Sequence, residues 1–212
     1  MTKIYIVRHG YSVANDELIF AGFLDSELNE TGLKQAQTLK EFFKDKKVDK
    51  VYSSDLRRAF DTVKVVADFF NLEVIPCKEL RELYGGDWEG IKYEDIATKY
   101  PNEFYFWRNK MQDLVTPNGE SIQELAERVS KAIREIAEDN DGKTVVIGTH
   151  GGAIRAFIAK ELKKDTKAMS VLGWVPNCSV STIEYENGKF KEIEIGNDKH
   201  VGNLATNLPK EV

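Results

Sequence analysis

Residues 4–10 read Ile-Tyr-Ile-Val-Arg-His-Gly, four apolar residues followed by a cation, an imidazole and a glycine. An apolar run of this length is typical of a strand that is buried on both faces of a sheet. Residues 50–53 and 144–148 read in the same way. Because long amphipathic stretches separate the three runs, the sequence predicts an α/β fold, a three-layer α/β/α sandwich with a mostly parallel central sheet.

The separating stretches carry apolar residues at helical spacing. Helices are expected over residues 31–44, 56–70, 121–137 and 153–162. Ser121 and Glu124 have the spacing of a capping box, which indicates a helix start. Near the end of the chain, residues 179–185 and 190–195 flank a Glu-Asn-Gly turn, a pattern that predicts a hairpin supplying an edge strand.

The composition is that of an ordinary globular protein, with 42% hydrophobic and 31% charged residues, and residues 1–212 are expected to form a single catalytic domain. The net charge of −5 argues against nucleic acid or an anionic membrane as a partner. No apolar segment has the length of a signal-peptide core or a membrane helix. Cys77 and Cys178 show no paired spacing, so we expect reduced thiols and a cytoplasmic protein.

Each predicted strand delivers polar residues to its carboxyl end, where open α/β sheets bind ligands. The first ends on Arg8-His9-Gly10, the last on Thr149-His150-Gly151-Gly152, and Arg57-Arg58 follow the middle one. Arginine forks match phosphate oxygens, and glycine lets backbone N–H groups approach them. Like charge disfavours the cationic form of a histidine among arginines, so its ring stays nucleophilic. The pattern predicts a phosphate pocket and hydrolysis through a phosphohistidine.

Such a reaction needs a proton donor for the leaving alkoxide, and arginine cannot serve near neutral pH. Residues 79–90 (ELRELYGGDWEG) offer four carboxylates, Glu79, Glu82, Asp87 and Glu89, and their chemistry alone does not choose among them. His9, His150 and Glu82 would also be a permissible zinc or iron ligand set. The adjacent arginines would repel a cation, so we expect no metal.

These residues resemble the histidine phosphatase superfamily, the phosphoglycerate-mutase-like proteins. The resemblance covers nearly the whole chain in five blocks, in the family's order: residues 6–10 with Ser12 and Asn15, 22–32, 53–62, 80–90 and 149–152. Any one block alone is a weak signal, but five in register are specific. The implied fold is the α/β/α sandwich of that family.

The resemblance also implies roles for individual residues. His9 would be the phosphorylated nucleophile and Glu82 the proton donor. Arg8, Arg58 and His150 would complete the phosphate pocket. Further contacts to the substrate would come from Ser12, Asn15, Gly151 and the backbone near Gly22 and Phe23. Neither a metal nor another cofactor is expected.

The family contains phosphatases and cofactor-dependent mutases, and residues 91–119 favour the first. This segment is short, aromatic from Tyr93 to Trp107 and poor in basic residues, whereas the mutases usually carry a longer and more basic insertion. We expect residues 91–119 to form a small cap or lid. The predicted function is hydrolysis of small phosphorylated metabolites, as in the broad-specificity and α-ribazole phosphatase branches. The alternatives are a cofactor-dependent phosphoglycerate mutase and a non-catalytic module that binds phospholigands.

Three other positions have simpler interpretations. Tyr11 stands where the family often has Glu or Gln, which bears on substrate preference. His200 is expected at the surface, and Arg57 is expected to be a solvated helix residue. The sequence specifies neither the natural substrate nor the oligomeric state.

Overall fold

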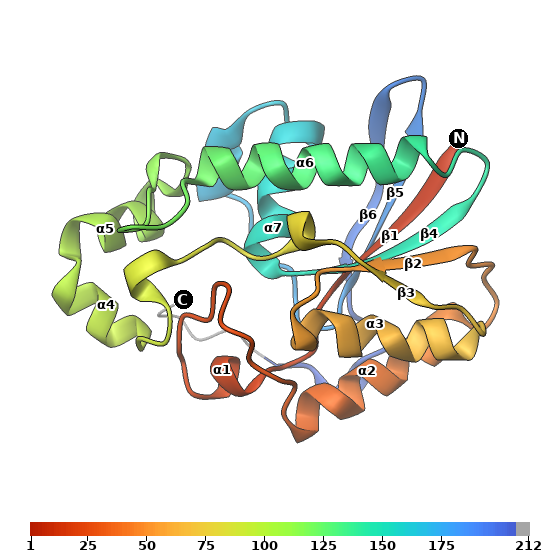
Figure 1. Cartoon of the computed structure of the whole chain (residues 1–212), viewed down its shortest axis with the longest axis horizontal. Coiled ribbons are helices and arrows are strands. Elements are labelled where there is room, and N and C mark those ends of the chain that lie inside the picture. The colour runs from red at the N-terminus through yellow and green to blue at the C-terminus, as the bar shows by residue number, and fades with distance from the viewer. Residues whose placement is uncertain (207–212) are drawn as a thin grey trace.

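A computed structural model describes residues 1–206 of the chain (Figure 1). Its sheet has six strands in the order β3-β2-β4-β1-β5-β6. The strands are β1 Thr2–Arg8, β2 Lys50–Ser53, β3 Val74–Pro76, β4 Thr144–Thr149, β5 Val180–Glu186 and β6 Lys189–Asn197. Strands β1 to β4 run parallel to one another, β5 pairs antiparallel with β1, and β6 pairs antiparallel with β5. The mostly parallel sheet and the hairpin with its edge strand are thus confirmed.

Helices cover both faces of this sheet. They are α1 Val13–Asp16, α2 Glu30–Phe43, α3 Arg57–Phe69, α4 Tyr93–Lys99, α5 Pro101–Asn109, α6 Ile122–Glu138 and α7 Gly151–Phe157, which continues as the π-helical turn Ile158–Leu162. Figure 1 shows α6 and α7 on one side of the sheet and α2 and α3 on the other. The three-layer architecture is therefore as predicted.

The core lies in two parts, one on each face of the sheet. Ile4 and Ile6 of β1 pack in the cluster that includes α6 and α7, whereas Tyr5 and Val7 pack in the cluster that includes α2 and α3. Successive side chains of a strand point to opposite faces, so a strand covered on both sides needs an unbroken apolar run. This is why residues 4–7 contain no polar residue.

The predicted helices lie within one or two residues of the observed ones, and local capping explains their starts. Asn29 precedes α2, and its side chain accepts a hydrogen bond from the N–H of Gly32 at 2.9 Å. Ser121 and Glu124 form both bonds of a capping box at the start of α6. The short strand β3 was not predicted, because its apolar run is only Val74-Ile75 and Pro76 follows directly.

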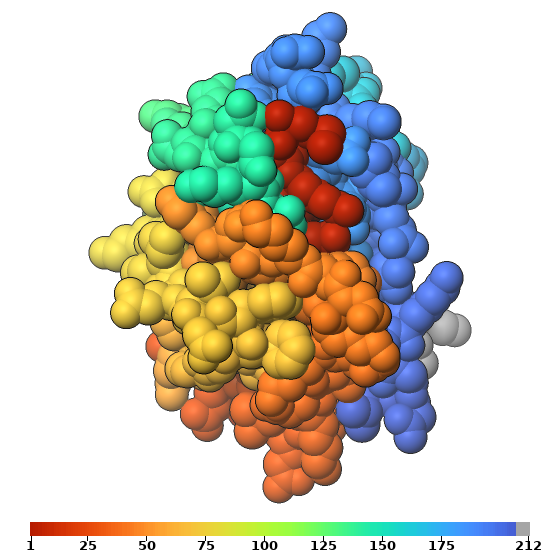
Figure 2. Space-filling view, turned by 90° about the vertical axis from the view of Figure 1, so that its right-hand side faces the viewer, coloured from red at the N-terminus to blue at the C-terminus, as the bar shows by residue number. Residues whose placement is uncertain are grey.

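Helices α4 and α5 lie at one end of the molecule and the N-terminus at the other (Figure 1). Figure 2 looks onto that second end, where the N-terminal segment, in red, lies between the blue C-terminal segments and the orange segments near α2 and β2. The parallel strands begin on that side, so their carboxyl ends point toward α4 and α5. Within residues 1–206, no helix has the length and apolarity needed to cross a membrane.

Candidate active site

A pocket opens at the carboxyl ends of the parallel strands. Adjacent pairing of β1 with β4 and of β4 with β2 brings His9, His150 and Ser54 together. The polar part of the lining consists of Arg8, His9, Tyr11, Ser12, Asn15, Gly22, Arg58, Glu82 and Gly152. The apolar part includes Leu18, Ile19, Phe20, Leu83, Tyr93, Trp107, Met111 and Trp174. One half of the pocket is thus charged and the other is built from hydrocarbon and aromatic rings.

The two histidines face each other, with ring centroids 5.2 Å apart. His9 Nδ1 lies 2.7 Å from the carbonyl oxygen of Gly10, and since a carbonyl can only accept, Nδ1 carries the proton and Nε2 keeps a free lone pair. His150 Nε2 lies 2.9 Å from Ser54 Oγ. Burial, followed by the positive charge of Arg58, lowers the pKa of both imidazoles well below 6.5. Both rings are therefore neutral at neutral pH.

Two arginines supply the charge of the pocket. Arg8 is 4% exposed and donates to the carbonyl of Val175, while Arg58 is 1% exposed and donates to the carbonyls of Gly22 and Leu24. Neither forms an ion pair with any carboxylate of residues 1–206. Burial lowers the pKa of each guanidinium to about 10, so both remain protonated at neutral pH. Two buried cations that form no ion pair with a carboxylate of residues 1–206 favour the binding of an anion.

Glu82 is the one carboxylate of the 79–90 segment that lines the pocket. Its Oε2 accepts from the N–H of Gly152 at 2.9 Å. Its Oε1 accepts from Leu83 at 2.8 Å and from Ala153 at 3.1 Å. The first turn of α7 therefore holds the carboxylate at the strand end that carries His150.

The other three carboxylates stabilise loops. Glu89 accepts from the N–H of Phe23 at 2.7 Å and of Gly85 at 3.1 Å. Asp87 accepts from the Asn118 side chain, and Glu79 is the acceptor for the Cys77 thiol.

The predicted substrate-binding residues divide into two groups. Ser12, Asn15 and Gly22 line the pocket, and Ser12 and Asn15 form the capping box of α1. Gly22 has φ +51, a conformation suited to glycine, and its carbonyl is turned to Arg58. Phe23 and Gly151 are not in the lining.

The structure gives these two residues other surroundings. The N–H of Phe23 is taken by Glu89, and its ring lies against Arg81, Arg128 and Tyr84. Gly151 lies beside Arg8 and Trp174, while its neighbour Gly152 faces Glu82 in the pocket.

One pocket residue, Tyr93, has no counterpart in the sequence motifs. The ring of Tyr93 stacks on Trp107 and meets Phe20 edge-on, and its hydroxyl bonds to no residue in the described part of the chain. Burial raises the pKa of this phenol, with Arg8, Arg58 and Glu82 near enough to influence it. The aromatic stretch 93–107 thus serves both the core and the pocket wall. The signal available in the sequence was only its aromatic content.

Positions outside the pocket include one wrong prediction. His200 is half-buried rather than a surface residue, with Nε2 3.0 Å from the Cys178 carbonyl oxygen and its ring against Phe42. Arg57 is 54% exposed and pairs with Asp25 and Glu27. Among the described residues, no group of three His, Cys, Asp or Glu side chains is arranged to hold a metal ion.

The fold is an α/β protein with helices on both faces of a mostly parallel sheet, and its pocket lies at the carboxyl ends of the strands, where such proteins bind ligands. The arginines and the histidine of the pocket suit a phosphate group. The family model for the histidine phosphatase superfamily (branch 1) matches residues 4–198, and the chain belongs to this family.

Curated relatives align over most of their length. A phosphoglycerate mutase-like protein 4 of Arabidopsis thaliana is 34% identical over 92% of this chain and 85% of its own. A metal-independent phosphoserine phosphatase of the same plant is 36% identical over 90% and 79%. An adenosylcobalamin/alpha-ribazole phosphatase of Escherichia coli is 28% identical over 94% and 98%.

Among solved structures, YhfR of Bacillus stearothermophilus superposes with a TM-score of 0.90 at 27% identity, covering 95% of this chain and 100% of that one. The family and its phosphatase-named relatives establish the chain as a phosphatase, which confirms the predicted family, fold and enzyme class.

Proposed function

We propose that this phosphatase hydrolyses small phosphomonoesters through a phosphohistidine formed at Nε2 of His9. The observation that carries the proposal is the pair of buried, unpaired guanidiniums of Arg8 and Arg58 beside two neutral histidines. A phosphate dianion in this pocket would supply the counter-charge that the protein lacks, and the forked donors suit its oxygens.

In the first step, the lone pair of His9 Nε2 attacks phosphorus and the ester P–O bond breaks. Glu82 gives its proton to the departing oxygen, so the alcohol leaves neutral and Glu82 becomes a carboxylate. Arg8, Arg58 and His150 stabilise the charge on the transferring phosphoryl oxygens.

In the second step, water attacks the phosphoryl group and gives a proton to the Glu82 carboxylate. The P–N bond breaks, its electron pair returns to His9 Nε2, and inorganic phosphate leaves. The free enzyme is then regenerated with the same protons it started with. Ser12 and Asn15 would hold phosphate oxygens through both steps.

The apolar half of the pocket supports an organic leaving group. Phe20, Tyr93 and Trp107 form a wall that would contact the alcohol, and few polar groups fix its orientation. We infer that residues 91–119 act as a cap on one catalytic domain. Phosphoserine and α-ribazole phosphate, on which relatives are named to act, are the first natural esters to assay.

The test combines turnover with trapping of the intermediate. We expect hydrolysis of p-nitrophenyl phosphate by the wild type and none by His9→Ala. Rapid quenching should detect phosphate bound to His9, and Glu82→Gln should slow alkyl esters more than the nitrophenyl ester. Undiminished turnover by His9→Ala would refute the nucleophile. A phosphoglycerate exchange that a bisphosphate primer stimulates would instead support a mutase.

A further inference from the structure

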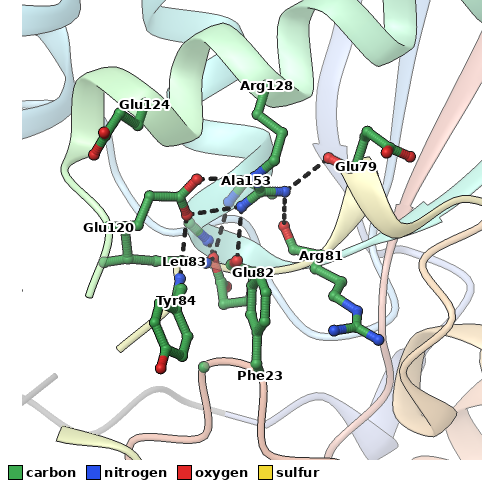
Figure 3. Close-up of polar contacts among 12 residues, drawn as sticks. Phe23, Glu79, Arg81, Glu82, Leu83, Tyr84, Glu120, Glu124, Arg128 and Ala153 are labelled. Atoms are coloured by element: carbon green, nitrogen blue, oxygen red, sulfur yellow. Dashed lines mark hydrogen bonds and ion pairs between the residues drawn. The ribbon is translucent and has the colours of Figure 1, made fainter. Parts of the chain in front are cut away.

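Arg128 holds the backbone of the segment that carries Glu82. It lies on α6, with its guanidinium turned toward residues 79–82 (Figure 3). Nη1 donates to the carbonyls of Glu79 at 2.8 Å and Arg81 at 3.0 Å, and Nη2 donates to the carbonyl of Glu82 at 3.0 Å. A single side chain thus binds three carbonyls of a segment that passes from the 3-10 turn Lys78–Leu80 into a loop.

Glu120 fixes the guanidinium in return. Its Oε1 accepts from Nε and its Oε2 from Nη2 of Arg128, each at 2.8 Å, and Oε2 also accepts from the N–H of Tyr84 at 3.2 Å. The three bonds to backbone carbonyls and the two to Glu120 together use all five N–H groups of Arg128. Only 21% of the Arg128 side chain and 12% of that of Glu120 are exposed, so the fork is shielded from competing water. The arrangement is a rigid clamp rather than a surface ion pair.

The clamp and α7 bind different groups of Glu82. The carboxylate accepts from Gly152 and Ala153 of α7, whereas the carbonyl of the same residue accepts from Arg128 of α6 (Figure 3). Thr149 adds a bond from its hydroxyl to the carbonyl of Leu80. The segment has no strand partner, so these side chains replace the backbone ladder that would otherwise fix it.

We propose that Arg128 is a positioning residue for proton transfer by Glu82. It touches no reacting atom and acts by fixing the Glu82 backbone relative to α6 and α7. This inference rests on the proposed role of Glu82 as proton donor. Because a lysine ammonium has three rotatable donors and no planar fork, it can keep the charge opposite Glu120 but cannot bind all three carbonyls.

The variant Arg128→Lys tests the proposal with the charge retained. A displaced proton donor matters most for a leaving group of high pKa, because nitrophenolate leaves without a proton. We expect kcat for an alkyl phosphate such as glycerol phosphate to fall by about 10- to 100-fold, since misplacement by about 1 Å costs roughly that much. The kcat for p-nitrophenyl phosphate should fall by no more than about threefold. Arg128→Ala should show the same selectivity, with a larger loss.

Arg134→Lys is the matched control. Arg134 lies on the same helix and donates to Glu161 and to the carbonyl of Gly188, away from the pocket. Its replacement should leave both kcat values unchanged. Thermal unfolding of each variant separates misfolding from displacement of Glu82, because a fraction of unfolded enzyme would lower the apparent kcat for both substrates equally.

A double variant separates this proposal from the one on which it rests. In the Glu82→Gln background, Arg128→Lys should add no further selectivity between the two esters, because the donor it positions is gone. Suppose that Glu82→Gln slows the alkyl ester more than the nitrophenyl ester. If folded Arg128→Lys then slows both esters equally, or slows neither, the positioning role of Arg128 is overturned. If Glu82→Gln itself shows no selectivity, the proton-donor assignment fails first.

Discussion

Replacing Gly152 by alanine should displace the Glu82 carboxylate without disturbing the fold. A Cβ at this position would lie 2.4 Å from Glu82 Oε1 and 3.2 Å from Cδ. The first distance is about 1 Å shorter than an ordinary contact. Oε1 must therefore move by about that amount, away from the N–H groups of Gly152 and Ala153 to which the carboxylate is now bonded.

The magnitude follows from this displacement. Misplacing a reacting group by about 1 Å costs on the order of 100-fold, and a proton donor contributes about 100- to 10,000-fold in all. We expect kcat of Gly152→Ala for an alkyl phosphate to fall by about 100-fold. The free energy of unfolding should change little, because Gly152 lies in a helix and the higher helix propensity of alanine, about 1 kcal/mol, offsets the displacement of Glu82.

The assay compares kcat for an alkyl and a nitrophenyl ester with the urea-unfolding free energy of the same preparations. Gly173→Ala serves as the control, because a Cβ there would meet no atom within 4 Å. Its kcat values should match those of the wild type. A Gly152→Ala enzyme that is folded and turns over the alkyl ester at the wild-type rate would refute the placement of Glu82 against α7.

Three further predictions concern the rest of the pocket. Arg58→Gln should raise the inhibition constant of inorganic phosphate by about 10- to 100-fold, the value of charge-assisted hydrogen bonds, and an unchanged constant would contradict its role. Tyr93→Phe keeps the stacking on Trp107 but removes the hydroxyl of a residue that lines the pocket, so KM for esters should rise at an unchanged melting temperature. An unaltered KM would place the substrate elsewhere. Burial lowers the pKa of His9 and His150 well below 6.5, so below pH 6.5 the unfolded chain binds protons that the native state does not. The free energy of unfolding should therefore fall as the pH drops below 6.5, by up to about 1.4 kcal/mol per pH unit for each histidine. Urea unfolding at a series of pH values measures this slope, and substituting His150 by Gln should reduce it.

The arrangement of the sheet could be predicted because each parallel strand is covered on both faces. Residues 4–7 must all be apolar under that constraint, and the alternation with amphipathic stretches then defines the layers. The strand β3 has three residues at the sheet edge, with Ile75 39% exposed, so the same constraint leaves no mark there. His200 was misplaced for a related reason. Its burial comes from a loop packing on Phe42 of α2, a contact that no local pattern encodes.

Within the site, the motifs located the charged residues but not what holds them. Arg128 binds backbone carbonyls 46 to 49 residues away, and a carbonyl has no sequence signature. Tyr93 belongs to an aromatic stretch in which only tertiary packing decides which ring faces the pocket. Gly151 was predicted to contact the substrate, but Gly152 lines the pocket instead. The two positions differ by one residue along α7, which corresponds to about 100° of rotation around the helix axis.

The partners of the charged groups differ inside and outside the pocket. Arg81 and Arg128, outside it, are neutralised by the carboxylates of Asp55 and Glu120. Arg8 and Arg58, inside it, are held by carbonyl oxygens, which fix a guanidinium without cancelling its charge.

Glu82 is held in the complementary way, by N–H groups rather than by a cation. The backbone thus orients three charges that no ion pair within residues 1–206 neutralises. Their field is available to the substrate, and little reorganisation is needed when phosphoryl charge shifts during transfer.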